Sequence, residues 1–224
     1  MTKVSDTPTW TNPKVAVDAV LFSIDKKKLR VLLIKIKQGQ YEDKWCVPGG
    51  LILAEETLEE AVKRILFQKT NVSGVYLEQL YTFGDLGRDS RSRAISVAYF
   101  ALLNKPEGYN IGTTPYYADI EWKNVAELPE LAFDHKKIIE TAHQRLKAKI
   151  GYSNIVYSLL PTDFSLTQMQ NVYEIILGEK LDKRNFRKKI LGIELVEKSN
   201  KILSGQAYRP AQLYHFTQRR LTLF

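Results

Sequence analysis

Residues Gly50–Val72 read GLILAEETLEEAVKRILFQKTNV, and this stretch decides the fold of the N-terminal part of the chain. From Thr57 to Thr70 the apolar residues recur at the 3.6-residue spacing of a helix with one buried face. These apolar positions are Leu58, Ala61, Val62, Ile65 and Leu66. Asn71 follows directly and tolerates the positive φ that often ends a helix. The stretch therefore predicts a loop that leads into an amphipathic helix.

The segments around this helix are typical of a β-sheet with one further helix. Runs rich in β-branched and apolar residues predict strands at 15–24, 29–37, 45–47, 74–83, 94–103 and 120–122. The third of these strands ends at Pro48-Gly49-Gly50, a strong turn signal. We expect Asp134 to cap a second helix that ends near Ile150.

The composition excludes several classes of protein. Hydrophobic residues make up 44% and charged residues 26% of the 224, which is ordinary for a globular protein. The single Cys excludes an internal disulfide, and with only three His a structural zinc site is not expected. The best apolar run, Val15 to Phe22, is broken by Asp18, and the N-terminus has no hydrophobic signal segment. We therefore expect a cytoplasmic protein that does not enter a membrane.

The C-terminal third has the element order of a winged helix-turn-helix. Residues 151–161 form the predicted domain junction, with Ile155, Val156, Leu159 and Leu160 buried. Ser165 is expected to cap a helix from 166 to 177, Gly178 to end it, and a second helix to run from 183 to 191. Short strands at 194–198 and 208–216 then surround a polar tip, Ser199–Gln206. In such domains the second helix enters the major groove of DNA.

The second of these helices is strongly basic. Residues 151–224 carry 11 Lys and Arg against 6 Asp and Glu, so they hold +5 of the formal net charge of +8. After its capping residue Asp182, the helix places Arg184, Arg187 and Lys188 within roughly 100° of arc, opposite Phe186 and Ile190. Arg and Asn side chains can read base edges, and Lys can bind phosphate. The residues predicted to contact DNA are Thr167, Gln168, Lys183, Arg184, Asn185, Arg187, Lys188, Lys201 and Arg209.

The stretch from Gly50 resembles the Nudix box, G-x5-E-x7-R-E-U-x-E-E-x-G-U, in which U is aliphatic. Five anchors match at the right spacing: Gly50, Glu56, Arg64, Leu66 and Val72. The preceding Pro-Gly-Gly is also similar to that family. The resemblance implies a mixed sheet between helices, an α/β/α sandwich.

The departures from this box bear on function. In the family, three glutamates after the Arg bind Mg²⁺ or Mn²⁺, and here their positions hold Ile65, Gln68 and Lys69. Magnesium requires hard, charged oxygen ligands. We therefore expect no metal, no cofactor and no catalytic residues, although Glu55, Glu59 and Glu60 offer an alternative carboxylate set. The pair Glu56 and Arg64 is interpreted first as a structural ion pair.

A small-molecule site is predicted beside this box. The segment Arg88–Arg93 holds three guanidinium groups in six residues, and Arg binds phosphates in a bidentate manner. A solvated basic loop is the alternative interpretation. The candidate effector-binding residues are Arg88, Arg91, Arg93, Glu56 and Arg64.

Together, the degenerate box, the stretch YTFGDLGRDSRSRAISVAYFALL (81–103) and the stretch LLPTDFSLTQMQNVYEIILGEKLDKRNFRKKIL (159–191) resemble the Nudix-related transcriptional regulators. These include the NrtR family, which responds to ADP-ribose, and the AraR type, which responds to arabinose. The resemblance implies an α+β chain with an effector-sensing Nudix-like domain at 1–150 and a winged helix-turn-helix at 151–224. It implies a homodimeric repressor, acting on NAD or sugar metabolism genes, that binds an inverted-repeat operator in double-stranded DNA. A Nudix pyrophosphohydrolase acting on ADP-ribose-like compounds and an RNA-binding module are the competing hypotheses.

Overall fold

A computed structural model describes residues 11–104, 117–203 and 211–224 of the chain. Seven strands form one mixed sheet: β1 (Lys14–Asp25), β2 (Lys28–Ile36), β3 (Trp45–Cys46), β4 (Gly49–Leu51), β5 (Tyr76–Phe83), β6 (Ala94–Leu103) and β7 (Tyr117–Asn124). The main path of the sheet is β3-β2-β1-β6-β5, with β4 on β1 and β7 on β2. Among the strand pairs that the structure describes, β1 and β6 run parallel and the others antiparallel, which confirms the mixed sheet.

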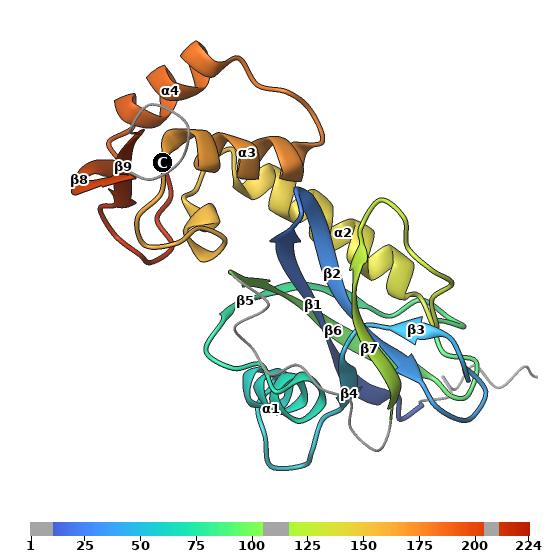
Figure 1. The fold of residues 1–224 in the computed structure, drawn as a ribbon. Helices are drawn as coiled ribbons and strands as arrows, with labels where there is room; N and C mark the ends of the chain where they lie inside the picture. The colour runs from blue at the N-terminus through green and yellow to red at the C-terminus, as the bar shows by residue number, and fades with distance from the viewer. Residues whose placement is uncertain (1–10, 105–116, 204–210) are drawn as a thin grey trace, which may run out of the picture.

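Two helices, α1 (Leu58–Thr70) and α2 (His135–Lys149), cover opposite faces of this sheet (Figure 1). Alternation along β1 explains the arrangement, because successive side chains of a strand point to opposite faces. Val17 and Ala19 pack with α1, whereas Val20 and Phe22 belong to the cluster that includes α2. The helix predicted at 57–70 is therefore confirmed, with Thr57 as its cap and Asn71 ending it at φ 57°.

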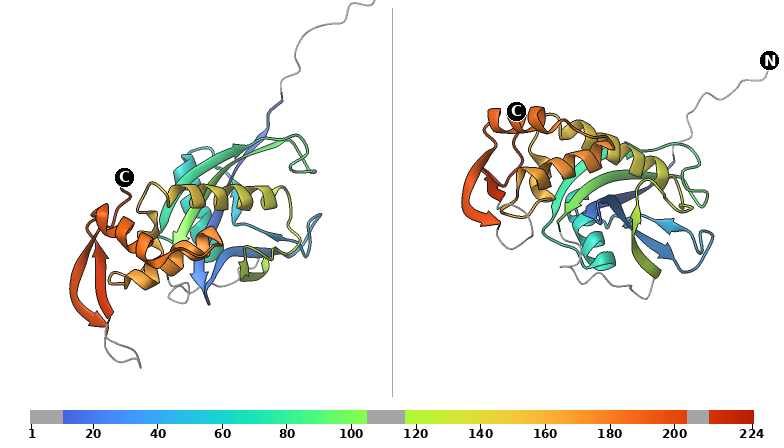
Figure 2. Two further views of the ribbon diagram at one scale, coloured as in Figure 1. Left: turned by 90° about the horizontal axis from the view of Figure 1, so that it is seen from above. Right: turned by 45° about the horizontal axis from the view of Figure 1, so that its top comes forward.

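The C-terminal part follows the predicted order of elements. It consists of a 3-10 turn η2 (Ile155–Ser158), then α3 (Leu166–Leu177), α4 (Lys183–Gly192), β8 (Val196–Leu203) and β9 (Ala211–Phe216). Ser165 and Gln168 form a capping box at the start of α3, and Gly178 ends that helix at φ 79°. The predicted polar tip is partly wrong, because β8 continues through Ser199 to Leu203 and pairs with β9. These elements gather beyond one end of the sheet (Figures 1 and 2).

One hydrophobic core joins the two parts. Ile138, Ile139 and Leu146 of α2 belong to the same buried cluster as Ile155 and Val156 of the junction and as residues of α3 and α4. The four junction residues predicted to be buried are 0–6% exposed. Because α2 packs both on the sheet and on α3, it connects the N-terminal part directly to the C-terminal helices.

The end of the chain is fastened to the junction by hydrogen bonds. The Arg219 guanidinium donates to three carbonyl oxygens at 2.9–3.1 Å, those of Tyr157, Leu160 and Pro161. The Asn154 side chain donates to the carbonyls of Gln218 and Arg220 and accepts from the Thr222 amide. The sequence patterns did not predict this clamp, which satisfies backbone groups that would otherwise need water.

Candidate functional site

A cavity of about 450 Å³ lies where β1, the Pro48–Gly50 loop, the 88–94 segment and the start of α2 meet. Its charged lining residues are Lys14, Asp18, Lys69, Arg88, Asp89 and Arg91. Four cations and two anions give this lining a formal charge of +2. The cavity is therefore suited to an anionic ligand.

Asp18, on β1, is the buried centre of a polar network in the cavity wall. Its carboxylate accepts a hydrogen bond from Ser96 Oγ at 2.5 Å and lies 3.4 Å from Arg88 Nη2 and 3.5 Å from His135 Nε2. Burial alone would raise the pKa of Asp18, but His135, Ser96 and Arg88 hold it below its ordinary value. His135 Nδ1 accepts from the Val47 amide, so its proton lies on Nε2 and faces Asp18.

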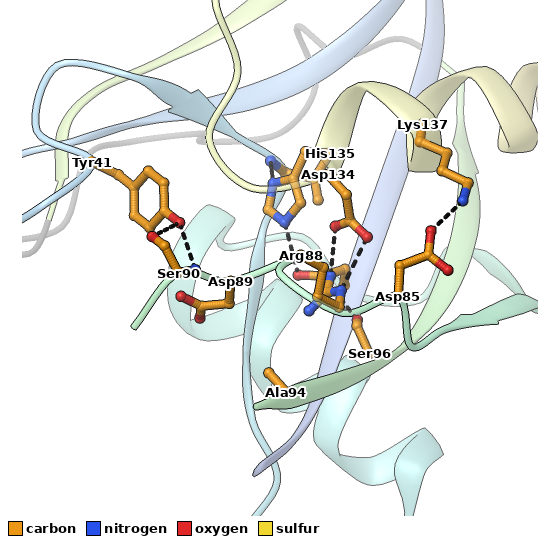
Figure 3. Close-up of polar contacts among 12 residues, drawn as sticks. Tyr41, Asp85, Arg88, Asp89, Ser90, Ala94, Ser96, Asp134, His135 and Lys137 are labelled. Atoms are coloured by element: carbon orange, nitrogen blue, oxygen red, sulfur yellow. Dashed lines mark hydrogen bonds and ion pairs between the residues drawn. The ribbon is translucent and has the colours of Figure 1, made fainter. Parts of the chain in front are cut away.

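Arg88 links this network to the beginning of α2 (Figure 3). Its guanidinium donates to Asp134 through Nε at 3.0 Å and Nη2 at 2.7 Å, and its side chain is 5% exposed. The prediction that Asp134 caps α2 is wrong in its detail, because that carboxylate makes no capping hydrogen bond and binds Arg88 instead. Arg88 thus reaches the cavity wall with its charge already neutralised.

Arg91 lies over two aromatic rings at the cavity. Its guanidinium carbon is 5.0 Å from the centre of the Phe133 ring and 5.5 Å from that of Tyr41, and it makes a bidentate pair with Asp89. Arg93 is placed differently: it donates to the carbonyls of Asp85 and Ala94 and is not among the cavity-lining residues. Of the three predicted guanidiniums, Arg88 and Arg91 therefore reach the cavity.

The other two candidate effector residues form an ion pair outside the cavity lining. Arg64 donates to both carboxylate oxygens of Glu56, at 2.8 and 2.5 Å, and to the carbonyl of Leu51 at 3.2 Å. The hydrogen bond from Arg64 lowers the pKa of Glu56. This geometry agrees with the interpretation of the pair as a structural link between loop and helix.

The three positions that hold glutamates in the family do not fit a divalent cation. Ile65 is 2% exposed and packs in the α1 cluster, so close to Gly50 that an added Cβ there would lie 3.1 Å from its Cδ1. Gln68 accepts from Arg64. Lys69 points its ammonium into the cavity and donates to the Gly49 carbonyl. A buried alkyl group, a neutral amide and a cation supply none of the charge that Mg²⁺ requires.

The alternative carboxylates are largely engaged elsewhere. Glu60 completes the capping box of α1 with Thr57, and Glu59 pairs with Lys63 at 3.9 Å. In the part of the chain that the structure describes, no group of three or more His, Cys, Asp or Glu side chains is placed to hold a metal ion. In the same residues no helix is both long and apolar enough to cross a bilayer.

The second candidate site is the exposed face of α4. Phe186 and Ile190 are buried, and the Phe186 ring packs edge-on against Tyr173 of α3 at 5.2 Å. The predicted DNA-facing residues Lys183, Arg184, Asn185 and Lys188 are exposed. Asp182 caps the helix, because its carboxylate accepts from the Asn185 amide at 2.8 Å. The helix is therefore anchored on one side and presents cations on the other.

The five remaining DNA candidates have local partners or lie outside the described residues. Arg187 is half-buried and donates to Thr167 at 3.5 Å, and the Gln168 side-chain oxygen is engaged in the capping box. Lys201 pairs with Asp163 at 2.8 Å. Arg209 lies outside the described residues. Lys201 must therefore exchange a carboxylate for a phosphate in order to bind DNA.

A buried carboxylate shapes the turn between α3 and α4. Glu174 accepts from the Leu181 amide, from Gln170 and from Lys180, at 3.1, 2.9 and 2.6 Å. The Lys180 hydrogen bond, followed by those from Leu181 and Gln170, lowers the pKa of Glu174 to about 2. This residue sets the position of α4 relative to α3 and was not singled out from the sequence.

Sequence reasoning also missed Asp18 and His135 as members of the cavity. Asp18 was visible as the one charge in a buried apolar strand, which is a signal for a buried polar site. The partners that neutralise it lie at least 70 residues away in the chain, so no local spacing reveals them.

Comparison with protein families gives two consecutive matches. A NUDIX domain model matches residues 12–142, and a model of the NrtR DNA-binding winged helix domain matches residues 156–216. The chain is similar, at 36% identity, to an ADPR-responsive transcriptional repressor of Acinetobacter baylyi, covering 92% of this chain and 83% of that protein. It is also 30% identical to an ADP-ribose pyrophosphatase of Methanocaldococcus jannaschii, over 58% of this chain and 73% of that enzyme.

Solved structures of Shewanella oneidensis NrtR have a similar fold. The crystal structure of that protein with a 27mer DNA has a TM-score of 0.79 at 34% identity, covering 91% of this chain and 93% of that one. A cocrystal structure of its NUDIX domain with ADP-ribose has a TM-score of 0.55 at 36% identity, covering 61% of this chain and 90% of that one.

Proposed function

Because the chain belongs to the NrtR family of Nudix-related transcriptional regulators, we propose that it is a repressor whose affinity for DNA is controlled by a small anionic effector. The observation that carries this proposal is the succession, within one chain, of a Nudix-type cavity of positive charge and a winged helix with an exposed cationic α4. The domain boundary proposed from the sequence, between residues 150 and 151, falls between the two family matches. We also propose a cytoplasmic location, which similarity to a bacterial transcriptional repressor supports.

We propose ADP-ribose as the effector. Both the Acinetobacter repressor and the Shewanella NUDIX domain are described with this ligand, and a diphosphate complements a cationic lining. A neutral pentose, the effector type of the AraR group, has no phosphate for such a lining to bind. Calorimetric titration with ADP-ribose and with arabinose separates the two, because saturable heat only with arabinose would contradict the choice of ADP-ribose.

Arg91 is the predicted effector contact that the cavity geometry favours most. We expect Arg91→Ala to weaken ADP-ribose binding by roughly 1.5–3 kcal/mol, the scale of a charge-assisted hydrogen bond. Arg93→Ala is the matched control, since Arg93 comes from the same loop but lies outside the lining. Equal losses in both variants would show that the loop acts without a specific contact.

Helix α2 offers a physical route between the two sites. Its first residue His135 belongs to the cavity network, and His143, two turns later, hydrogen-bonds the Ile176 carbonyl of α3 at 3.0 Å. A ligand that shifts the start of α2 would therefore move α3 and α4, and differential affinity for the two arrangements would release DNA. The ratio of DNA dissociation constants with and without ADP-ribose, measured by fluorescence anisotropy, tests this; a ratio near one would contradict the proposed repressor mechanism.

We propose a homodimer on DNA. One recognition helix covers only a few base pairs, so a symmetric dimer on an inverted repeat, with half-site centres about 10–21 base pairs apart, supplies the required selectivity. Sedimentation of the chain with an operator duplex should give two chains per duplex. One chain per duplex at saturation would contradict the proposed geometry.

The second candidate function is a pyrophosphohydrolase, which the similarity to the Methanocaldococcus enzyme favours. We propose that hydrolysis has been lost, and the buried Ile65 together with Lys69 in the cavity supports this. Incubation with ADP-ribose and millimolar Mg²⁺ or Mn²⁺ should release no AMP at an enzymatic rate. Metal-dependent turnover near the usual range of ~1–10³ s⁻¹ would contradict the proposal that hydrolysis has been lost.

A further inference from the structure

The most unusual charge in the cavity is the ammonium group of Lys69. It lies on the last turn of α1, donates to the Gly49 carbonyl, and is 4.9 Å from the centre of the Tyr117 ring. Among the other cations of the wall, the buried Arg88 is paired with Asp134 and Asp18, the exposed Arg91 is paired with Asp89, and Lys14 is exposed to solvent. In the described part of the chain, Lys69 has no carboxylate within salt-bridge distance.

A cation in such a position raises the free energy of the ligand-free protein. Withdrawing an ammonium from water is costly unless an opposite charge compensates it. Burial accordingly lowers the pKa of Lys69. A carbonyl oxygen and an aromatic face stabilise the ammonium only in part, so the missing negative charge is available to be supplied by a ligand.

From this arrangement we infer that Lys69 takes the place of the divalent cation and binds the diphosphate of the effector, so that effector binding needs no metal. The inference rests on the proposed function, because the diphosphate belongs to the proposed ligand. The ammonium occupies a box position that carries a metal-binding glutamate in hydrolases of this fold, and its carbonyl partner Gly49 is the first residue of β4, directly before the box. A carboxylate with a bound divalent cation has a net charge of +1. The Lys69 ammonium supplies the same net charge without a metal ion.

Two features fix the position of the ammonium. Ile65, one helical turn before Lys69, fills the apolar space beneath Gly50 and keeps this loop close to α1. Gly49 must lack a side chain, since an added Cβ would lie 1.8 Å from Asp18 Oδ1. The Gly49 carbonyl is therefore held where it orients the ammonium, and the charge is preorganised rather than carried on a freely moving side chain.

The experiment is a calorimetric titration of the full chain with ADP-ribose, first in EDTA and then in millimolar Mg²⁺. We expect the dissociation constant in EDTA to be equal to, or lower than, that in Mg²⁺, because Mg²⁺ in solution competes for the diphosphate. Lys69→Met, which keeps the length of the side chain, should weaken binding by about 10- to 100-fold. Lys63→Met is the matched control, since Lys63 lies on the same helix, is 66% exposed, and is not part of the cavity lining.

Thermal unfolding without ligand confirms that each variant is folded, and Lys69→Arg should retain more affinity than Lys69→Met if the charge itself is required. Binding by the parent chain only when Mg²⁺ is present, or binding by Lys69→Met within twofold of the parent, would overturn the inference while leaving the proposed function intact. No binding of ADP-ribose by the parent chain in either buffer would overturn the proposed effector and this inference together.

Discussion

The cavity and helix α4 both gather cations, but they differ in how those cations are matched. In the cavity wall, Arg88 and Arg91 are paired with aspartates from the chain itself, whereas the half-buried Lys69 has no acidic partner in the described residues. On α4, the described residues place no carboxylate within salt-bridge distance of Arg184 or Lys188. Counting basic residues in the sequence therefore gives a fair estimate of the charge that α4 can offer to DNA. The same count overestimates the charge that the 88–93 loop can offer to a ligand.

The largest expected effect concerns Arg88, which the comparison identifies as part of the scaffold. Replacing it by Met should lower the free energy of unfolding by about 3–5 kcal/mol, because Asp134 and Asp18 would lose their buried counter-charge. Equilibrium unfolding in urea measures the loss. Arg93→Met, an exposed residue of the same loop, should stay within about 0.5 kcal/mol of the parent. If both variants lose a similar free energy of unfolding, then pairing with buried carboxylates does not distinguish Arg88 from Arg93.

The next effect concerns arginines of α4 that have no carboxylate partner in the described residues. Arg184→Ala and Arg187→Ala should each cost about 1–3 kcal/mol on an operator selected from random duplexes, and less on random DNA, if they read bases. Fluorescence anisotropy at fixed salt gives both affinities. Lys28→Ala, which removes an exposed cation at the start of β2, should leave both affinities unchanged. Equal losses on operator and random DNA would assign these arginines to phosphate contact instead.

A third test concerns the paired carboxylate within the DNA-binding part. The pKa of Glu174 is about 2 in the folded chain against an ordinary 4.5, so its stabilising contribution is complete above pH 4.5 and is lost as the pH falls toward 2. Glu174→Gln should therefore reduce stability at pH 7 and make unfolding less dependent on pH below 4.5. Unfolding curves recorded at pH 7 and pH 3 show the difference. If Glu174→Gln unfolds with the same pH dependence as the parent chain, then Glu174 is not the source of the stability lost below pH 4.5.

The smallest expected effect concerns Lys201, a cation that is exposed but paired with a carboxylate. Lys201→Ala should weaken binding to operator and random DNA alike by less than about 1 kcal/mol, because the side chain already pairs with Asp163. Asp163→Asn should do the opposite: it frees Lys201, tightens binding to random DNA, and steepens the salt dependence by roughly one unit. Weaker binding by Asp163→Asn would show that the ion pair organises the β8–β9 ribbon.

The sequence predicts helix boundaries best where a capping residue directly precedes the helix or a residue that tolerates positive φ directly follows it. The α3 boundaries were predicted correctly from Ser165 and Gly178, and Asn71 correctly marked the end of α1. The 94–103 strand was also placed correctly, because its apolar run is continuous. By contrast, the length of β8 depends on its pairing with β9, which no local pattern contains.

The candidate site was harder to predict, because its chemistry depends on contacts between distant segments. The three arginines of the loop look equivalent in the sequence, yet Asp134 binds Arg88, Asp89 binds Arg91, and backbone carbonyls bind Arg93. Only the fold decides which guanidinium meets which acceptor. The poor fit of positions 65 and 69 to a metal ion could be predicted from the sequence, because neither Ile65 nor Lys69 has a side-chain oxygen in any fold.

The packing of Ile65 also bears on how such a protein could evolve. The Ile65 side chain packs in one cluster with Val17 and Val62 beneath Gly50, so its surroundings are complementary to an alkyl group. Returning a glutamate to position 65 alone would bury an unpaired carboxylate, a loss that equilibrium unfolding of Ile65→Glu would register. The apolar packing at position 65 therefore opposes the introduction of a metal-binding carboxylate by a single substitution, because the substitution would destabilise the fold before it could create a metal site.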